Sequence, residues 1–154
     1  SVLVATKGGH TRRGTDWELD GSPDNLRRAC EASLRRLGGD AIGLYQFHRP
    51  DPATPWEESI GGLRQLVDDG LVRAAGISNA DVGQIDGARA ILGDALVSVQ
   101  NQFSPGWRAS AGELAHCAEL GLAWLPWSPF GGISAAGSLH VQAPEFAAVA
   151  AELG

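Results

Sequence analysis

The chain lacks methionine and has only one lysine, one tyrosine and two cysteines in 154 residues. Cys30 and Cys117 fall in helix-like segments, without CxxC or metal-ligand spacing, which argues against a metal site. We expect both to be small buried side chains in a reducing compartment, and we place the protein in the cytoplasm. No apolar run approaches the roughly 18 residues of a membrane helix, so no membrane span is expected.

The chain also lacks an excess of positive charge. Its 12 Lys and Arg residues are outnumbered by 18 Asp and Glu residues, for a formal net charge of -6. No basic run stands out, which argues against nucleic acid or an anionic membrane as a partner. With 44% hydrophobic and 19% charged residues, the composition is that of an ordinary globular domain with a real core.

Methionine is absent even at position 1, and the sequence opens inside an apolar run, Val2 to Thr6, without a capping element. We therefore expect this chain to be a piece of a longer protein.

Apolar strand-like runs alternate with amphipathic helix-like segments along the chain. Strands are predicted at 2–6, 41–47, 71–77, 96–100 and 122–127, and residues 8–21 are predicted to form a loop. Continuous apolar strands between helices favour a parallel sheet covered by helices. Neither GxGxxG in the first turn nor GxxxxGK[ST] is present, so a nucleotide-binding open sheet lacks its fingerprint.

Capping signals mark where the predicted helices begin. Ser22-Pro23 offers a hydroxyl cap followed by proline, and Gly38-Gly39 ends that helix. Capping boxes are predicted at 54–57 and 110–113, a further helix is predicted from about Asp81 to Leu92, and the last helix is predicted to start at Ala143.

This order predicts an α/β fold, a (β/α)8 TIM barrel that is incomplete here. About five βα units are visible, whereas a complete barrel typically needs roughly 250 residues. We expect residues 1–154 to form a single partial barrel domain.

The single lysine, Lys7, stands at the end of the first strand, where a barrel enzyme places chemistry. Each later strand also ends in a polar or aromatic group, and each group alone has an ordinary structural explanation. Taken together, they predict one ring of functional side chains around one mouth of the barrel: Lys7, His48, Ser78, Asn79, Gln100, Trp127 and Ser128.

Five segments containing these strand ends resemble the aldo-keto reductases. They are ATKGG at 5–9, LYQFHRPDP at 44–52, GISN at 76–79, VQNQFSP at 99–105 and PWSPFGG at 126–132. The resemblance follows the whole chain in order and corresponds to strands three to seven of the parent barrel.

The resemblance implies reduction of aldehydes or ketones by hydride transfer from NADPH, without a metal. The family uses a Tyr, Lys, His and Asp tetrad, in which Lys7 matches the lysine and His48 the histidine. A nearby cation lowers the pKa of a tyrosine acid, and an imidazole orients the carbonyl of a small substrate.

The resemblance also implies a binding site for the cofactor. Ser78, Asn79 and Gln100 match the groups that bind the nicotinamide carboxamide, and Trp127 matches the aromatic residue that stacks on the ring. The match to the pyrophosphate loop comprises Ser128, Pro129, Phe130, Gly131 and Gly132.

Two tetrad members, the Tyr and the Asp, belong upstream of the Lys strand and are not in this sequence. Tyr45 lies inside a strand and is interpreted as structural. We therefore expect the chain alone to be inactive, and the preference for NADPH over NADH comes from the resemblance only. The tryptophans Trp17, Trp56 and Trp107 could line a pocket or simply pack, with Trp56 expected in the core.

Two other functions stay open. The barrel could be a non-catalytic nicotinamide-nucleotide-binding module, as a regulatory subunit or an inactive fragment. Lys7 could instead form a Schiff base in an aldolase-type barrel, but the Ser-Asn, Gln and Trp strand ends would then be unexplained.

Overall fold

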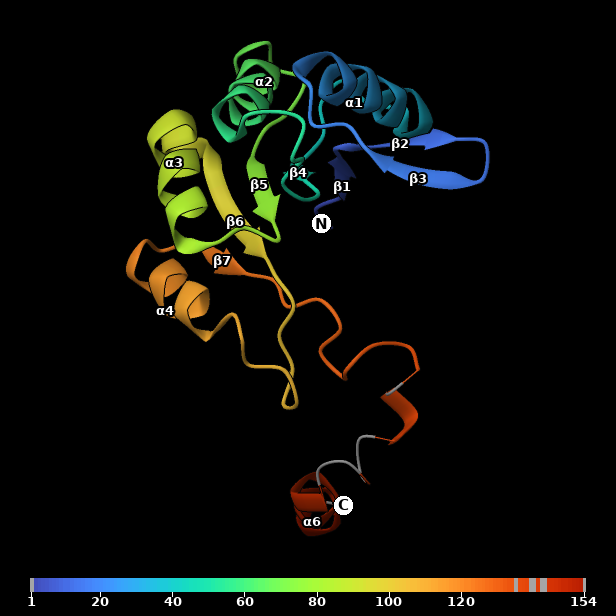
Figure 1. Ribbon diagram of the computed structural model, residues 1–154, viewed down its shortest axis with the longest axis vertical. Coiled ribbons are helices and arrows are strands. Elements are labelled where there is room, and N and C mark those ends of the chain that lie inside the picture. Colours follow the sequence, from blue (N-terminus) through green and yellow to red (C-terminus); the bar gives the residue numbers. More distant parts are fainter. Residues whose placement is uncertain (1, 135, 139–140, 142–143, 154) are drawn as a thin grey trace.

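The computed structural model describes residues 2–134, 136–138, 141 and 144–153. Five parallel strands form one sheet in the order β1-β4-β5-β6-β7 (Figure 1). Their bounds are Ala5–Gly8, Leu44–Phe47, Ala75–Ser78, Leu96–Gln100 and Ala123–Trp124. The predicted parallel sheet is therefore confirmed, with sequential strands as neighbours, as a βα barrel requires.

Helices α1 to α4 follow one another along one face of this sheet (Figure 1). They span Pro23–Leu37, Trp56–Asp68, Val82–Leu92 and Ala111–Glu119. Short 3-10 turns occupy Gly93–Ala95 and Ala136–Ser138. The last helix, α6 (Pro144–Leu153), lies apart from the sheet in Figure 1, and Ala143, expected to open it, lies outside the described residues.

Strand β4 shows how the two faces of the sheet differ. Successive side chains of a strand point to opposite faces. Tyr45 and Phe47 point to the helices, where the Tyr45 hydroxyl donates to the Leu26 carbonyl at 3.1 Å and the Phe47 ring lies 5.6 Å from that of Trp56. Gln46 points to the other face, which is the interior side of the barrel arc.

The two cysteines are buried free thiols in the helical layer, as predicted. Burial raises the pKa of both Cys30 and Cys117 to about 11. Both therefore stay protonated at neutral pH and behave as small apolar side chains.

The predicted ends of α1 are confirmed. The Ser22 side chain accepts a hydrogen bond from the backbone N–H of Asn25 at 3.3 Å, and Gly38 closes the helix at φ 68°. The left-handed backbone conformation at this position costs glycine little energy, because glycine has no Cβ.

The two predicted capping boxes are wrong. Pro55, not Thr54, precedes α2, and the Thr54 hydroxyl donates instead to Asp51. Ser110 adopts φ -89° and ψ 26°, away from the extended conformation that lets a side chain cap a helix. The one capping box in the described helices joins Asp81 and Gln84 at the start of α3.

Four strands are displaced or shorter than predicted. The second, predicted at 41–47, begins only at Leu44. The first begins at Ala5 and runs to Gly8 because its partner β4 begins only at Leu44, which leaves residues 2–4 exposed. The third begins at Ala75, since residues near Val72 make only an isolated bridge to Ile42. The fifth is reduced to Ala123–Trp124, with Trp127 in a separate bridge to Gln102.

The predicted loop at 8–21 contains an antiparallel hairpin, β2 (His10–Arg13) and β3 (Asp16–Leu19). Its strands are short, half-buried or exposed, and contain only two apolar residues, Trp17 and Leu19, so they lack the continuous apolar run used to predict the other strands. Side-chain contacts across the hairpin stabilise it instead: Arg12 lies 4.0 Å from the centre of the Trp17 ring, and Arg13 pairs with Glu18 at 3.1 Å.

Asp51 fixes the segment that follows His48 to the start of α1. Its carboxylate accepts hydrogen bonds from the Gly21 N–H at 2.8 Å, the Ala53 N–H at 2.9 Å and the Thr54 hydroxyl at 2.9 Å. These hydrogen bonds, led by the one from Gly21, hold the pKa of the Asp51 carboxyl below its ordinary value.

We predict that Asp51→Asn lowers the free energy of unfolding by about 1–3 kcal/mol at pH 7, because a buried charge-assisted network is broken. A carboxyl with a lowered folded pKa stabilises the fold above its unfolded pKa, and this stabilisation is lost as the pH falls through the folded pKa. The difference from wild type should therefore shrink below about pH 4. Urea unfolding at pH 7 and below about pH 4 measures the loss of stability and its dependence on pH. The control is Asp40→Asn, at an exposed carboxylate. Equal losses of unfolding free energy in the two variants would contradict the role of Asp51.

Candidate functional site

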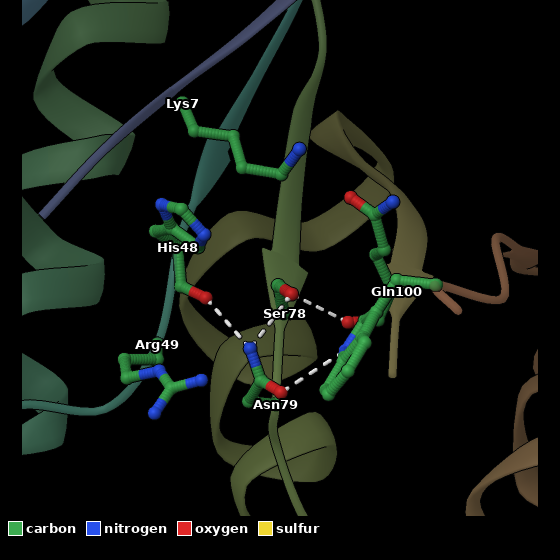
Figure 2. Close-up of a pocket in the computed structure, with 7 residues that line it drawn as sticks. Lys7, His48, Arg49, Ser78, Asn79 and Gln100 are labelled. Atoms are coloured by element: carbon green, nitrogen blue, oxygen red, sulfur yellow. Dashed lines mark hydrogen bonds between the residues drawn. The ribbon is translucent and has the colours of Figure 1, made fainter. Parts of the chain in front are cut away.

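The polar strand ends converge on one cavity of about 320 Å³ (Figure 2). All five strand ends contribute to it, as expected from the sequence, but Ser128, which was also expected in this ring, does not line the cavity. The lining residues are Lys7, His48, Arg49, Ser78, Asn79, Gln100 and Trp127.

Strand register explains this convergence. Lys7 of β1 is paired with Gln46 of β4, and His48, two residues after Gln46 and just past the end of β4, follows on the same face. Ser78 is paired with Gln100 as the last residues of β5 and β6. Because all strands are parallel, their carboxyl ends reach the same edge of the sheet.

Asn79 ties three strand ends together. Its side-chain N–H groups donate to the His48 carbonyl at 2.9 Å and to the Ser78 hydroxyl at 3.1 Å, and its side-chain oxygen accepts from the Trp127 indole at 3.1 Å. Asn79 has φ 58°, a left-handed conformation that Asn adopts more readily than most residues. This conformation directs the amide back over the strand ends, where Figure 2 shows its hydrogen bonds.

Gln100 provides the unsatisfied group of the cavity. The Ser78 hydroxyl donates to the Gln100 backbone carbonyl, and the Asn79 N–H donates to the same oxygen at 3.1 Å. The side-chain oxygen of Gln100 is buried, yet no described residue donates a hydrogen bond to it. Such an acceptor is costly unless a ligand or water supplies the donor.

Asn101 does not line the cavity but holds two of the segments that do, a role that the sequence patterns did not indicate. Its buried amide donates to the Ala80 carbonyl at 2.8 Å and accepts from the Ala80 N–H at 3.1 Å. Its backbone carbonyl accepts from the Trp127 N–H at 3.0 Å. Asn101 therefore fixes the turn that carries Asn79 and the backbone of Trp127 at the same time.

His48 lies beside a second imidazole that the sequence reading placed in a loop. The rings of His10 and His48 are 4.4 Å apart between centroids, in an edge-to-face arrangement. Burial, followed by the charges of His10, Lys7 and Arg49, lowers the pKa of His48 to about 4. His48 is therefore neutral at physiological pH and presents an imidazole that can donate one hydrogen bond and accept another.

The loop predicted to approach a pyrophosphate does not line this cavity. Ser128 has φ 52°, and the Gly131 N–H donates to the Ser128 carbonyl at 2.9 Å, which forms a tight turn just after Trp127. Pro129 and Phe130 are exposed within this turn.

Some of the remaining aromatic residues lie in the core and others are exposed. Trp56 packs against the core and its indole donates to the Gln84 carbonyl at 3.0 Å, as expected for a core position. Trp17 and Trp107 are exposed, although Trp17 lines a second cavity beside His10. Tyr45 is fully buried away from the cavity, and burial raises the pKa of its hydroxyl, so its structural interpretation is confirmed.

An arc of parallel strands with polar groups at the carboxyl ends defines a β/α-barrel protein with its site at the usual mouth. The sequence profile of the Aldo/keto reductase family matches residues 1–144, and the chain belongs to this family of oxidoreductases. "Probable aldo-keto reductase 1" of Glycine max is 39% identical over 132 residues, which cover 84% of this chain and 38% of that protein.

Two solved structures share the fold. The glycerol dehydrogenase of Gluconobacter oxydans has a TM-score of 0.75 and 33% identity, and the match covers 80% of this chain and 39% of that one. The holo form of an aldo-keto reductase from Bacillus halodurans has a TM-score of 0.70 and 29% identity, over 80% of this chain and 41% of that one. The fold is thus part of the (β/α)8 barrel of this family, and the chain spans about two fifths of the relatives' length.

We predict that at pH 5.5 the His48 ring is neutral and the His116 ring is protonated. His48 stays neutral, with its pKa lowered to about 4, whereas contact with Asp86 at 2.7 Å raises the pKa of His116 above its ordinary value. Imidazole 15N chemical shifts distinguish the two states, and His48→Gln and His116→Gln assign the signals. A His48 ring that is protonated at pH 5.5 would show that the cavity is more solvated than its burial implies.

Proposed function

We propose that the complete enzyme containing this chain reduces aldehydes or ketones to alcohols, with NADPH as the hydride donor. The main support is that all five strand ends that resemble those of aldo-keto reductases line one cavity. This cavity also contains the buried side-chain oxygen of Gln100, which lacks a hydrogen-bond donor among the described residues. The activity is assigned to the longer protein, because this chain covers about two fifths of its relatives.

The residues of the cavity fit a nicotinamide. The free Gln100 oxygen is an acceptor for the carboxamide N–H, and Trp127, fixed by Asn79 and Asn101, offers a flat indole against which the ring can stack. Bound there, the cofactor would supply the hydride. Ser78 and Asn79 are already engaged in hydrogen bonds between strands, so we propose that they act mainly by holding this pocket in shape, with direct contacts secondary.

Lys7 and His48 are proposed as the polar catalytic groups of this chain. His48 is neutral and half-buried, so its ring can donate a hydrogen bond to a substrate carbonyl oxygen and orient it. Lys7 reaches the same cavity and is proposed to lower the pKa of a tyrosine acid, which the resemblance places upstream of this chain.

Three finer features of the proposal come from the family resemblance: a preference for NADPH over NADH, a metal-free reaction and a small carbonyl substrate. The proposed cytoplasmic location comes from the two buried free cysteines. None of the helices in the described residues is long and apolar enough to cross a membrane. Membership in a family of oxidoreductases favours an enzyme over the alternative of a non-catalytic nucleotide-binding module.

In the complete enzyme, Lys7→Met should lower kcat by well over tenfold while the Kd for NADPH changes much less. The substitution keeps the chain length but removes the charge that is proposed to act on the tyrosine. Steady-state turnover and cofactor titration by tryptophan fluorescence separate the two effects. Survival of kcat within about tenfold, a loss of only about 1.4 kcal/mol, would exclude Lys7 from the tetrad.

The isolated 154-residue chain should not oxidise NADPH in the presence of an aromatic aldehyde. Its one tyrosine, Tyr45, is buried and donates to Leu26, so no phenol can reach the cavity. Absorbance at the NADPH band measures the rate. Steady oxidation by the pure chain would mean that another group supplies the proton.

A further inference from the structure

Positive charge is concentrated on one wall of the cavity, although the whole chain carries a net charge of -6. Figure 2 shows His48 and Arg49 on one side and Gln100 on the other, with Ser78 and Asn79 between them. A second cavity of about 840 Å³ shares Lys7, His48 and Arg49 with the first, and adds His10 and Arg36. None of the described residues lining either cavity is Asp or Glu.

Arg49 lines the cavity beside His48 and has no acidic partner among the described residues, unlike five of the eleven arginines of the chain. Five others pair with carboxylates in the described structure: Arg13, Arg27, Arg28, Arg64 and Arg89. Arg49 is exposed at the cavity mouth, one residue after His48, and no described residue forms a salt bridge with it. An unpaired guanidinium presents two parallel N–H groups that match a carboxylate.

The position of Arg49 separates it from the part of the site proposed for the cofactor. The Gln100 amide and the Trp127 indole, which fit the nicotinamide, come from β6 and the segment after β7, whereas Arg49 follows β4. The loop proposed to approach the pyrophosphate, residues 128–132, is not among the lining residues of either cavity. Arg49 is therefore available to the other ligand, beside the imidazole that orients a carbonyl.

We infer that the substrate is an anionic carbonyl compound, an aldehyde or ketone bearing a carboxylate that Arg49 binds at the cavity mouth. This inference rests on the proposed function, because it takes the other ligand of the cavity to be the substrate. Arg49 is a specificity-determining residue here, and the hydride and proton transfers do not pass through it.

The charge preference can be measured without turnover. The probes are 4-(hydroxymethyl)benzoate and its methyl ester, a pair of alcohol products that differ in charge and cannot form an imine with Lys7. Calorimetric titration of the chain at low salt should show the carboxylate binding about tenfold more tightly than the ester. Arg49→Gln should abolish this preference, whereas Arg73→Gln, an exposed arginine before β5, should retain it.

Two results would overturn the inference: equal binding of the two probes by the wild type, or an unchanged preference in Arg49→Gln. A preference that persists in concentrated salt would also count against it, because a contact with an exposed charge is screened.

Turnover by the complete enzyme separates this inference from the proposed function. With 4-formylbenzoate, Arg49→Gln should raise KM about tenfold and leave kcat nearly unchanged, and with methyl 4-formylbenzoate neither value should move. A uniform loss with both aldehydes would mean a structural role and would overturn the inference. If the wild type reduced neither aldehyde but still preferred the anionic alcohol, the reductase proposal would fail while the anion site would stand.

Discussion

The site depends on the side-chain amide of Asn79, which joins the ends of three strands. It donates to the backbone after β4, to Ser78 at the end of β5 and accepts from Trp127 after β7. A parallel sheet brings strand ends to one edge, but it does not orient the side chains that follow them. The left-handed backbone of Asn79 and the clamp of Asn101 on Ala80 supply that orientation.

Around this amide, the cavity has two chemically different walls. One carries Lys7, His48 and Arg49, and the other carries Gln100 and the Trp127 indole. Burial and the nearby cations keep His48 neutral, so positive charge stays on the lysine and arginine. This separation suits a reaction in which a flat, uncharged ring and a polar carbonyl group must lie side by side.

Much of the fold follows from the sequence, because apolar strands and glycine stops are local signals. The sheet, its helices and the cap at Ser22 were predicted, whereas the capping boxes at 54–57 and 110–113 were not found. The motif at 110–113 does not cap its helix because Ser110 lacks the extended backbone that a capping side chain needs. The motif at 54–57 does not cap its helix because the Thr54 hydroxyl binds Asp51 instead. The β2–β3 hairpin was missed because it has no continuous apolar run; contacts such as that of Arg12 with the Trp17 ring stabilise it instead.

The candidate site was predictable to a similar extent. The lining residues at the strand ends could be named, because strand direction alone places Lys7, Ser78 and Gln100 at one edge. The roles of Arg49, His10 and Asn101 could not be inferred, since they depend on which way a loop or turn bends after its strand. The sequence also could not predict that the Gln100 side-chain oxygen lacks a hydrogen-bond donor. This depends on where the surrounding donors lie in the folded protein, and none of the described residues donates to it.

A crystal structure of the complete protein with NADP+ would show whether this cavity receives a nicotinamide. The carboxamide nitrogen should lie within about 3 Å of the Gln100 side-chain oxygen, with the nicotinamide ring against Trp127. A nicotinamide bound elsewhere, with the Gln100 oxygen still lacking a donor, would contradict this prediction.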